Sequence, residues 1–320
     1  MKTLVLSMIS IAATVAAMTA CTSESDPVDE VVNPKDAKVE IKLNAGVVNV
    51  ETKADLNYSD KETTFGDNVT VQLLRWDAAS STYEAPTWAD VTSKTATISG
   101  TNITLDTDQK YYDKNGKYAF FIGLYPITNM TYENDGTVKY TGVDGSVDIL
   151  CAKAISAGNN TSSANTDIKF KHMLSQVKIT LKGNAAAQKT FGQIQSVKLK
   201  NIPQNLNITL GDNPSIEADK TTPNLKDITL KSSAFSLSEG ETCTTMIMPS
   251  LGKSEETKLQ IEITTELGES PIIIDIKDLT EGMMSGTTNN INLTFKDKIE
   301  VTTSIDNWET GANKEIDYGN

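Results

Sequence analysis

The chain contains one histidine, one arginine and three cysteines among its 320 residues. His172 is therefore the only imidazole available as a base for a Ser-His-Asp or Cys-His arrangement. The cysteines lie far apart in no metal-ligand spacing, and the sequence has no Gly-rich phosphate loop, His-x-x-x-His pair or Gly-x-Ser-x-Gly motif. These absences argue against an enzyme and predict a protein without a cofactor or metal.

Positive charge is also scarce, with 29 Lys and Arg against 42 Asp and Glu and a formal net charge of −13. Binding to nucleic acid requires a basic patch, which this sequence does not assemble, so DNA and RNA are excluded as partners. After the first residues, no apolar run approaches the roughly 20 residues of a membrane helix. We therefore expect the remainder of the chain to be soluble.

The first 20 residues have the composition of an export signal. Lys2 is their one charge, Leu4–Ala17 is an apolar core, and small residues lead to Cys21. The ending Met-Thr-Ala-Cys resembles the lipobox of bacterial lipoproteins, in which the cysteine receives the lipid. The alternative is an ordinary signal peptide followed by an incidental cysteine. We predict a lipoprotein signal peptide at 1–20, lipid on Cys21 and an unstructured polar tether at 21–37.

Period-two alternation of apolar and polar residues dominates the rest of the chain and predicts an all-β protein. A polar, small-residue stretch at 156–166 separates two halves, so we expect two antiparallel β-sandwich domains, at 38–165 and 166–320. One short helix is expected to start near Ala185. The expected strands are 39–50, 69–73, 96–105, 118–124 and 147–152 in the first half, and 168–181, 197–202, 206–210, 246–249, 259–263, 272–276 and 291–295 in the second.

The two remaining cysteines and the histidine each allow two interpretations. Cys151 and Cys243 could form one bridge in an exported protein. Both lie in apolar, alternating runs, which slightly favours buried free thiols. Phe170, His172 and Leu174 share one face of an expected strand. This position favours a packed, hydrogen-bonded structural histidine over a catalytic one.

Two further patterns are weak candidates for ligand binding. The segment from Asp106 to Gly116 has the carboxylates of a calcium loop, but Tyr111 occupies the position where the EF-hand pattern needs glycine, and a hairpin turn at Asp113–Gly116 explains it better. Trp76, Trp88 and Trp308 could form a platform that stacks on sugars. Packing in the core is the alternative role for such tryptophans.

The segment Phe170-Lys171-His172-Met173-Leu174-Ser175 resembles the hallmark of the fimbrillin family, the lipoprotein pilins of Bacteroides-type bacteria, where Phe-x-His-x-Leu-Ser/Ala opens a strand. The structural motif residues are thus Phe170, His172, Leu174 and Ser175. Further segments agree with the family in its own order along the chain. These are 121–126, 148–150, 246–249 and 305–308.

The resemblance implies two tandem transthyretin-like β-sandwiches and a non-catalytic, adhesive assembly protein. Such a protein is exported as an outer-membrane lipoprotein precursor and then enters the fimbria. In pilus-forming members, a trypsin-like protease cuts after a basic residue beyond the first strand, and the groove that opens accepts a strand from another subunit. The implied partners are further fimbrillin subunits, both copies of this chain and accessory tip or anchor subunits, and the outer membrane through the lipid on Cys21. The receptor is unknown.

Placed on this sequence, the scheme makes 38–53 the removable first strand and 299–320 the donor-like tail. The family commonly has an arginine at the cut. The only arginine here, Arg75, lies within an expected strand, so the candidate processing site is Lys53 followed by Ala54. A chain left uncut would stay anchored and act as a base, a tip, a standalone adhesin or a glycan-binding module.

Overall fold

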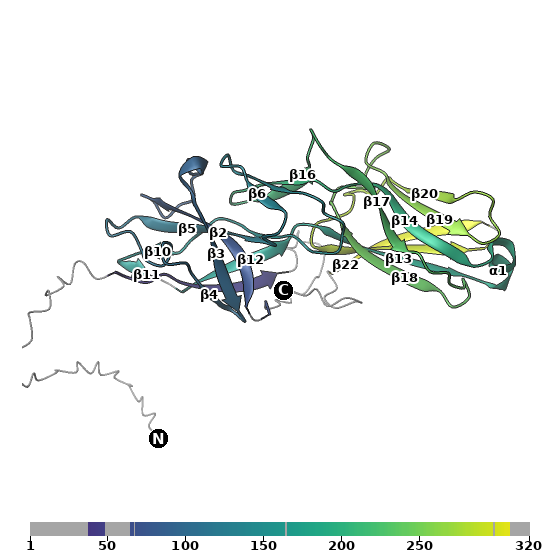
Figure 1. Cartoon of the computed structure of the whole chain (residues 1–320), viewed down its shortest axis with the longest axis horizontal. Coiled ribbons are helices and arrows are strands. Elements are labelled where there is room, and N and C mark those ends of the chain that lie inside the picture. Colours follow the sequence, from purple (N-terminus) through teal and green to yellow (C-terminus); the bar gives the residue numbers. More distant parts are fainter. Residues whose placement is uncertain (1–37, 49–64, 67, 164, 297, 308–320) are drawn as a thin grey trace, which may run out of the picture. The chain divides into compact units, whose positions relative to one another are not determined.

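The computed structural model describes residues 38–48, 65, 66, 68–163, 165–296 and 298–307. These residues form an all-β protein, as predicted, with one short α-helix, α1 (Ala185–Phe191), and the 3-10 turn η2 (Trp88–Asp90) (Figure 1). The side chain of Asn184 caps α1 by accepting a hydrogen bond from the Ala187 N–H at 2.8 Å. Among the described residues, no helix has the length and apolar character needed to cross a membrane.

The first group of strands closes on itself. In spatial order they run β2-β3-β4-β1-β12-β8-β5, and β5 pairs with β2, so seven strands form a barrel-like ring with β9 attached to β5. Apolar side chains of alternate residues fill the ring, including those of Leu73, Phe121 and Phe170. The strands are β1 (Lys42–Val48), β2 (Val69–Ala78), β3 (Thr92–Ser99), β4 (Asn102–Thr104), β5 (Tyr118–Tyr125), β8 (Leu150–Ala152), β9 (Ile155–Ser156) and β12 (Asn165–His172).

A separate sheet covers the outside of this ring. β5 is apolar along its whole length, so its outward residues Phe120, Ile122 and Leu124 need cover as much as the inward ones do. The cover is a four-stranded sheet in the order β16-β15-β7-β6, whose residues Tyr140 and Ile208 share one buried cluster with the outer face of β5. The strands are β6 (Met130–Tyr132), β7 (Thr137–Tyr140), β15 (Leu206–Thr209) and β16 (Ser215–Ala218), and a small hairpin, β10 (Gly158–Asn159) with β11 (Ser162–Ser163), lies apart from it.

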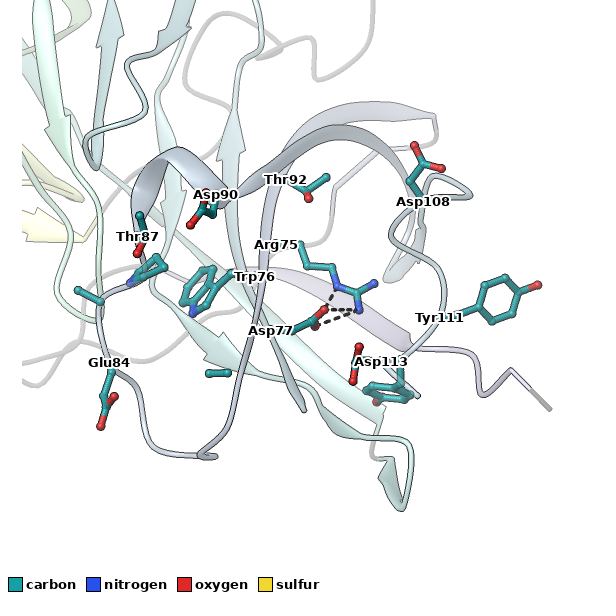
Figure 2. A pocket seen from close by; sticks show the side chains of 14 residues that line it. Arg75, Trp76, Asp77, Glu84, Thr87, Asp90, Thr92, Asp108, Tyr111 and Asp113 are labelled. Atoms are coloured by element: carbon teal, nitrogen blue, oxygen red, sulfur yellow. Dashed lines mark hydrogen bonds and ion pairs between the residues drawn. The ribbon is translucent and has the colours of Figure 1, made fainter. Parts of the chain in front are cut away.

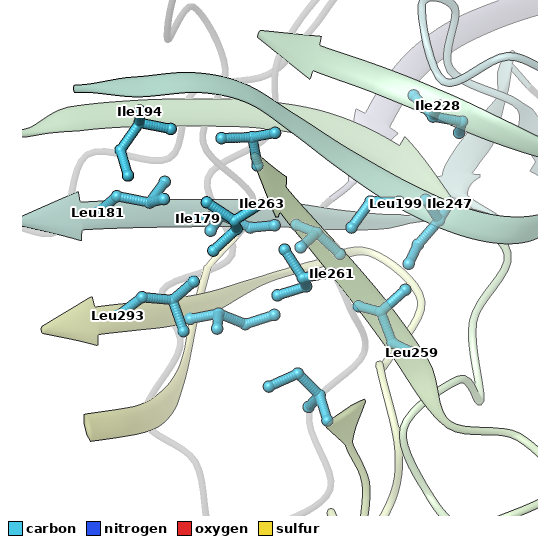
Figure 3. Close-up of a cluster of buried hydrophobic side chains, with 14 of the residues drawn as sticks. Ile179, Leu181, Ile194, Leu199, Ile228, Ile247, Leu259, Ile261, Ile263 and Leu293 are labelled. Carbon is cyan, nitrogen blue, oxygen red and sulfur yellow. The ribbon is translucent and has the colours of Figure 1, made fainter. Parts of the chain in front are cut away.

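The last strands form a β-sandwich. One sheet has the order β18-β13-β21-β22 and the other β17-β14-β19-β20. Side chains from both sheets meet in a single apolar core, in which Ile179 and Leu293 of the first sheet pack with Ile261 of the second (Figure 3). The strands are β13 (Ser175–Gly183), β14 (Ile194–Pro203), β17 (Leu225–Lys231), β18 (Glu241–Ile247), β19 (Leu259–Thr265), β20 (Ile272–Ile276), β21 (Thr287–Phe295) and β22 (Ile299–Asn307).

The structure corrects the expected strand arrangement in two ways. The sheets are not wholly antiparallel, because β1 pairs in parallel with β12, and β13 in parallel with β21. The segment expected as one strand, 168–181, is two strands in different sheets, and the first of them, β12, belongs to the ring. β7 and β15, which lie on either side of this segment in the sequence, pair in one sheet. Alternation reports which residues are buried, but not the direction or the partner of a strand.

Candidate functional site

β1 is a strand whose side chains alternate cleanly between the ring interior and its surface. Its inward residues are Leu43, Ala45 and Val47, and Ile41, just before the strand, continues the same two-residue spacing. All four are 1–5 % exposed and belong to the core of the ring. β12 pairs with β1 over the full length of β1, from Lys42 beside Asn165 to Val48 beside Lys171. β1 is therefore an integral part of the ring in this form of the protein.

The opposite edge of β1 is joined much less completely. β4 pairs with it only at Leu43 and Asn44. Single backbone hydrogen bonds supplement this pairing, such as Ile41 N–H to the Lys110 carbonyl at 2.9 Å and Ala45 N–H to the Thr101 carbonyl at 2.7 Å. A hollow of about 360 Å³ lies beside this edge. β1 is thus held continuously on one side only, which makes it more separable than a central strand.

Phe170, the first residue of the hallmark segment, packs in the core of the ring next to β1. Phe170 is fully buried, lies beside Val47 in the β1–β12 register and contacts Phe65 edge-on with ring centroids 5.0 Å apart. Its ring lies directly over Gly123 of β5, where any Cβ atom would collide with it. Glycine at 123 is therefore a requirement of close packing.

His172 is buried and structural, as predicted. Its side chain and that of Asp148 are both fully buried, and Nδ1 contacts Asp148 Oδ2. The other carboxylate oxygen of Asp148 accepts the Ile149 N–H at 2.8 Å, and the Ile149 carbonyl accepts the Met173 N–H at 2.8 Å. Asp148 was not singled out from the sequence as a partner, although it begins the segment 148–150 that resembles the family.

The remaining motif residues carry the chain from the ring to the sandwich. Leu174 is fully buried, and its carbonyl accepts the Gly286 N–H at 2.8 Å. The Ser175 hydroxyl donates to the Met284 carbonyl at 2.6 Å. The six-residue motif therefore fills the ring with Phe170, is fixed by the His172–Asp148 pair, and holds the loop before β21 through Leu174 and Ser175.

A second candidate element is β22, an edge strand of the sandwich. It pairs with β21 along its whole length, and Val301 and Ile305 lie opposite the buried residues Leu293 and Asn289. Val301 and Ile305 are nevertheless 41 % and 38 % exposed. A hollow of about 400 Å³ lies beside Ile305 and Ile291. β22 thus presents an incompletely buried apolar face at an open edge of its sheet.

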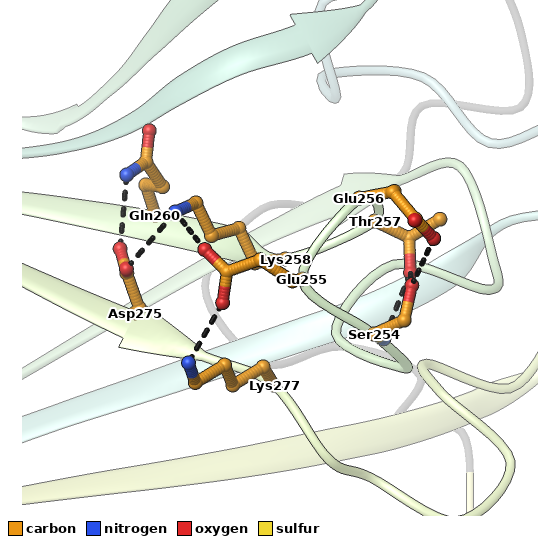
Figure 4. A network of polar contacts seen from close by, with 8 residues as sticks. All are labelled: Ser254, Glu255, Glu256, Thr257, Lys258, Gln260, Asp275 and Lys277. Carbon is orange, nitrogen blue, oxygen red and sulfur yellow. Dashed lines mark hydrogen bonds and ion pairs between the residues drawn. The ribbon is translucent and has the colours of Figure 1, made fainter.

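The edge strand of the opposite sheet, β20, is protected differently. Lys258 bridges Glu255 and Asp275, and Lys277 binds Glu255 at 2.7 Å (Figure 4). The hydrogen bonds from Lys258 and Lys277 lower the pKa of Glu255 to about 2. Lysines and charged networks on an edge strand discourage pairing with another chain. β20 thus carries a charged network at its edge.

Comparison with known proteins places this architecture in a family. The model of the fimbrillin-like family matches residues 52–308. The chain belongs to the fimbrillin-like family. This confirms the resemblance seen in the sequence, and the matched range begins after β1 and ends one residue after β22.

Solved structures similar to this fimbrillin-like protein share its fold at low sequence identity. A candidate cell adhesion protein from Bacteroides ovatus ATCC 8483 is 13 % identical, with a TM-score of 0.57 over 86 % of this chain and 100 % of that one. Another from Bacteroides uniformis ATCC 8492 is 15 % identical, with a TM-score of 0.53 over 84 % and 99 %. No significant match was found among curated proteins. The similarity to these structures supports the fold alone.

Several predicted site residues of the fimbrillin-like chain lie outside the described residues. These are Cys21, Lys53, Ala54 and Trp308, together with 308–320 of the predicted donor segment. Arg75 is described, and it is buried as expected. Its guanidinium donates to Asp77 at 3.0 Å (Figure 2). It also donates to the Gln109 carbonyl at 2.7 Å. A protease would not reach this arginine in the folded ring.

The two described tryptophans of the fimbrillin-like protein belong to a packed cluster. Trp76 is 8 % exposed and stacks on Phe120 with ring centroids 5.3 Å apart, and the ring of Trp88 lies 6.2 Å from that of Trp76. The neighbouring hollow, of about 440 Å³, has five acidic residues among the fourteen that line it, including Asp77 and Asp90 (Figure 2). Among the described residues, no group of three or more His, Cys, Asp or Glu is placed to hold a metal ion.

Both described cysteines are free and buried, so the thiol interpretation is confirmed. Cys151 lies in β8 and Cys243 in β18, in different sheets. Burial raises the pKa of Cys151 to about 12 and that of Cys243 to about 11. Because the thiolate is the reactive species, both thiols are expected to react slowly in the folded protein.

The buried Asp148–His172 contact yields a stability prediction. Asp148→Ala removes the acceptor of His172 and of the Ile149 N–H, so we expect a loss of about 3 kcal/mol in the free energy of unfolding. Urea unfolding followed by circular dichroism measures it. Asp90→Ala, at an exposed position, is the matched control and should change stability by less than about 0.5 kcal/mol. Equal effects of the two substitutions would contradict a structural role for the pair.

Proposed function

We propose that this fimbrillin-like protein is a structural subunit of a cell-surface fimbria that serves adhesion, has no catalytic activity and assembles by strand exchange. The observation that carries the proposal is β1, whose three inward side chains complete the ring together with Ile41 just before it, while only one edge of the strand is continuously paired. A strand with these properties can leave and be replaced by an equivalent strand from another subunit. The partners are other copies of the chain and accessory tip or anchor subunits.

If β1 leaves the ring, it leaves a groove beside β12, and filling this groove with another strand is energetically favoured over leaving it empty. Each large apolar side chain transferred from water to the ring core contributes about 1.5–3 kcal/mol. Loss of β1 and of the residue before it removes three such side chains from the core, those of Ile41, Leu43 and Val47. It also leaves the edge of β12 that paired with β1 without a partner strand. An open ring therefore gains strongly from any strand with the same alternation. This gain supplies the driving force for polymerisation.

The proposal includes the path to the surface. The signal peptide at 1–20 directs export, and lipid on Cys21 anchors the precursor to the outer membrane through the tether at 21–37. Cleavage after Lys53 then separates the subunit from this anchored segment, which includes the first strand at 38–53. The two units are a transthyretin-like first domain, made of the ring and its covering sheet, and a transthyretin-like second domain, made of the sandwich. A subunit that is never cut would serve instead as an anchored tip, base or adhesin.

Terminal sequencing tests this proposal. We expect the subunit in fimbriae shed from cells to begin at Ala54, and Lys53→Gln to leave the protein anchored with its lipidated Cys21. Mass spectrometry of the N-terminal peptide measures both. Lys42→Gln, which changes an exposed lysine within β1, is the matched control and should be cut normally. Shed fibres whose subunits still begin at Cys21 would contradict the exchange mechanism.

A further inference from the structure

Residues 204–224 leave the sandwich and cover the ring. The chain exits the sandwich at the end of β14, forms the hairpin of β15 and β16, and returns to the sandwich as β17, which pairs with β14. In the covering sheet, β15 pairs with β7 from Leu206 beside Tyr140 to Thr209 beside Thr137. The part of the chain that builds the sandwich thus supplies two of the four strands that cover the ring.

β5 separates two buried clusters of apolar side chains. Its inward side chains, such as Phe121, belong to an inner cluster together with the inward side chains of 41–47. Its outward side chains, such as Phe120, belong to an outer cluster together with Ile208 of β15. Among the described residues, no side chain of 38–48 belongs to the outer cluster. Loss of β1 therefore opens the inner cluster and leaves the outer cluster complete.

Backbone hydrogen bonds fasten the hairpin to the ring at its turn and at its entry. At the turn, the Gly211 carbonyl accepts the Ala154 N–H at 2.8 Å, and Ala154 lies between β8 and β9, which both pair with β5. At the entry, the Gln204 carbonyl accepts the Val143 N–H at 2.8 Å. These bonds also involve no residue of β1.

The two connections between the hairpin and the sandwich are bonded to each other. Asn205 donates from its N–H to the Pro223 carbonyl at 3.1 Å and from its side-chain amide to the Thr222 carbonyl at 2.8 Å. The Asp219 N–H donates to the Asn205 carbonyl at 2.9 Å. Hydrogen bonds from the hydroxyl and N–H of Thr221 and from the N–H of Thr222 lower the pKa of Asp219 to about 2. The sandwich therefore holds the hairpin by a cross-linked neck.

We propose, on the basis of the function proposed above, that residues 204–224 are a brace that keeps β5 and β8 folded while the groove is empty. Once β1 has left, the inner cluster is open to water. The outer cluster still covers the opposite face of β5, and the neck holds the brace in place. The cut subunit thus presents a preformed groove, which lowers the ordering cost of binding the next strand.

Cys151 reports on the brace. It lies in β8, is fully buried and belongs to the outer cluster, so iodoacetamide reaches its thiol only when this cluster opens. Chains that begin at Ala54 are isolated as monomers by gel filtration and labelled, and peptide mass spectrometry measures the rate at Cys151, with Cys243 of the sandwich as internal reference. We expect the rate at Cys151 to stay within about tenfold of the rate in the uncut chain. Labelling as fast as in the urea-unfolded chain would overturn the brace.

Two matched substitutions distinguish the clusters. Ile208→Ala removes a fully buried side chain from the outer cluster, and Ile98→Ala, in β3, removes one from the inner cluster. In the cut chain, we expect Ile208→Ala to accelerate labelling of Cys151 at least about tenfold and Ile98→Ala less than about threefold, because the inner cluster is already open. Equal acceleration would mean that the ring opens as one unit, without a separate brace. If Ile208→Ala does not fold, Asp219→Ala, which loosens the neck and leaves both clusters intact, takes its place with the same expectation.

Electron microscopy of the same chains separates this inference from the proposed function. Fibres built from chains whose Cys151 is labelled rapidly as monomer would overturn the brace and leave strand exchange standing. Chains with a protected Cys151 that never form fibres would contradict the proposed function, while the stability of the open ring would still be explained by the brace.

Discussion

Replacing Ile41 and Leu43 by aspartate should prevent stable folding of the uncut chain. Both side chains lie in the core of the ring, at 5 % and 3 % exposure, and Leu43 has β12 on one side and β4 on the other. Each substitution removes an apolar contact and buries a carboxylate without a partner, and we expect a loss of about 3–5 kcal/mol at each site. Chemical denaturation of the purified precursor measures the loss.

The control for this experiment lies on the same strand. Lys42→Asp introduces the same side chain at an exposed position between the two core residues, and it should change the free energy of unfolding by less than about 0.5 kcal/mol. If the Ile41→Asp, Leu43→Asp precursor were as stable as the Lys42→Asp precursor, β1 would not be an integral strand. In that case, the groove on which the proposed function depends would not exist.

Deleting residues 299–320 should abolish polymerisation of the cut chain and leave the ring of the uncut chain folded. β22 pairs only with β21 in the sheet order, whereas the ring is built from β1, β12 and strands that lie between them in the sequence. Electron microscopy of chains that begin at Ala54 detects fibres. Hydrogen exchange of the β5 amides in the uncut chain, which keeps β1, reports whether the ring is intact. We expect no fibres and unchanged protection of β5.

A shorter deletion identifies the part of the C-terminus that matters. Removing 308–320 keeps the whole of β22, and with it Ile299, Val301, Thr303 and Ile305, so fibres should still form. Fibres that form normally without 299–320 would remove the C-terminal segment as the donor. Fibres lost with either deletion would assign the donor role to the tail beyond β22.

Much of the site could be anticipated from local patterns. The alternation around Ile41 and Leu43 predicted a strand with a buried face, and the apolar neighbours of Arg75 predicted that this arginine is inaccessible. The position of His172 between Phe170 and Leu174 predicted a packed histidine. In each case the evidence was the spacing of apolar residues within a few positions of the residue concerned, which is the information that periodicity contains.

The partners of these residues could not be anticipated in the same way. Asp148 meets His172 from 24 residues away in the sequence, and Phe170 requires the glycine at position 123 of another strand. Nor did the pattern reveal what covers the second apolar face of β5, which is a sheet that combines β7 with β15. These contacts join segments distant in the sequence, so no local spacing encodes them.

The sequence by itself determined the all-β class, the family and the buried strand faces, because composition and alternation decide which side chains leave water. Only the tertiary structure decided that β1 lies parallel to β12, that the ring closes through β2 and β5, and that β7 pairs with β15. The physical reason is that any strand edge offers the same main-chain donors and acceptors, so the choice and direction of its partner depend on how all the apolar faces are covered together.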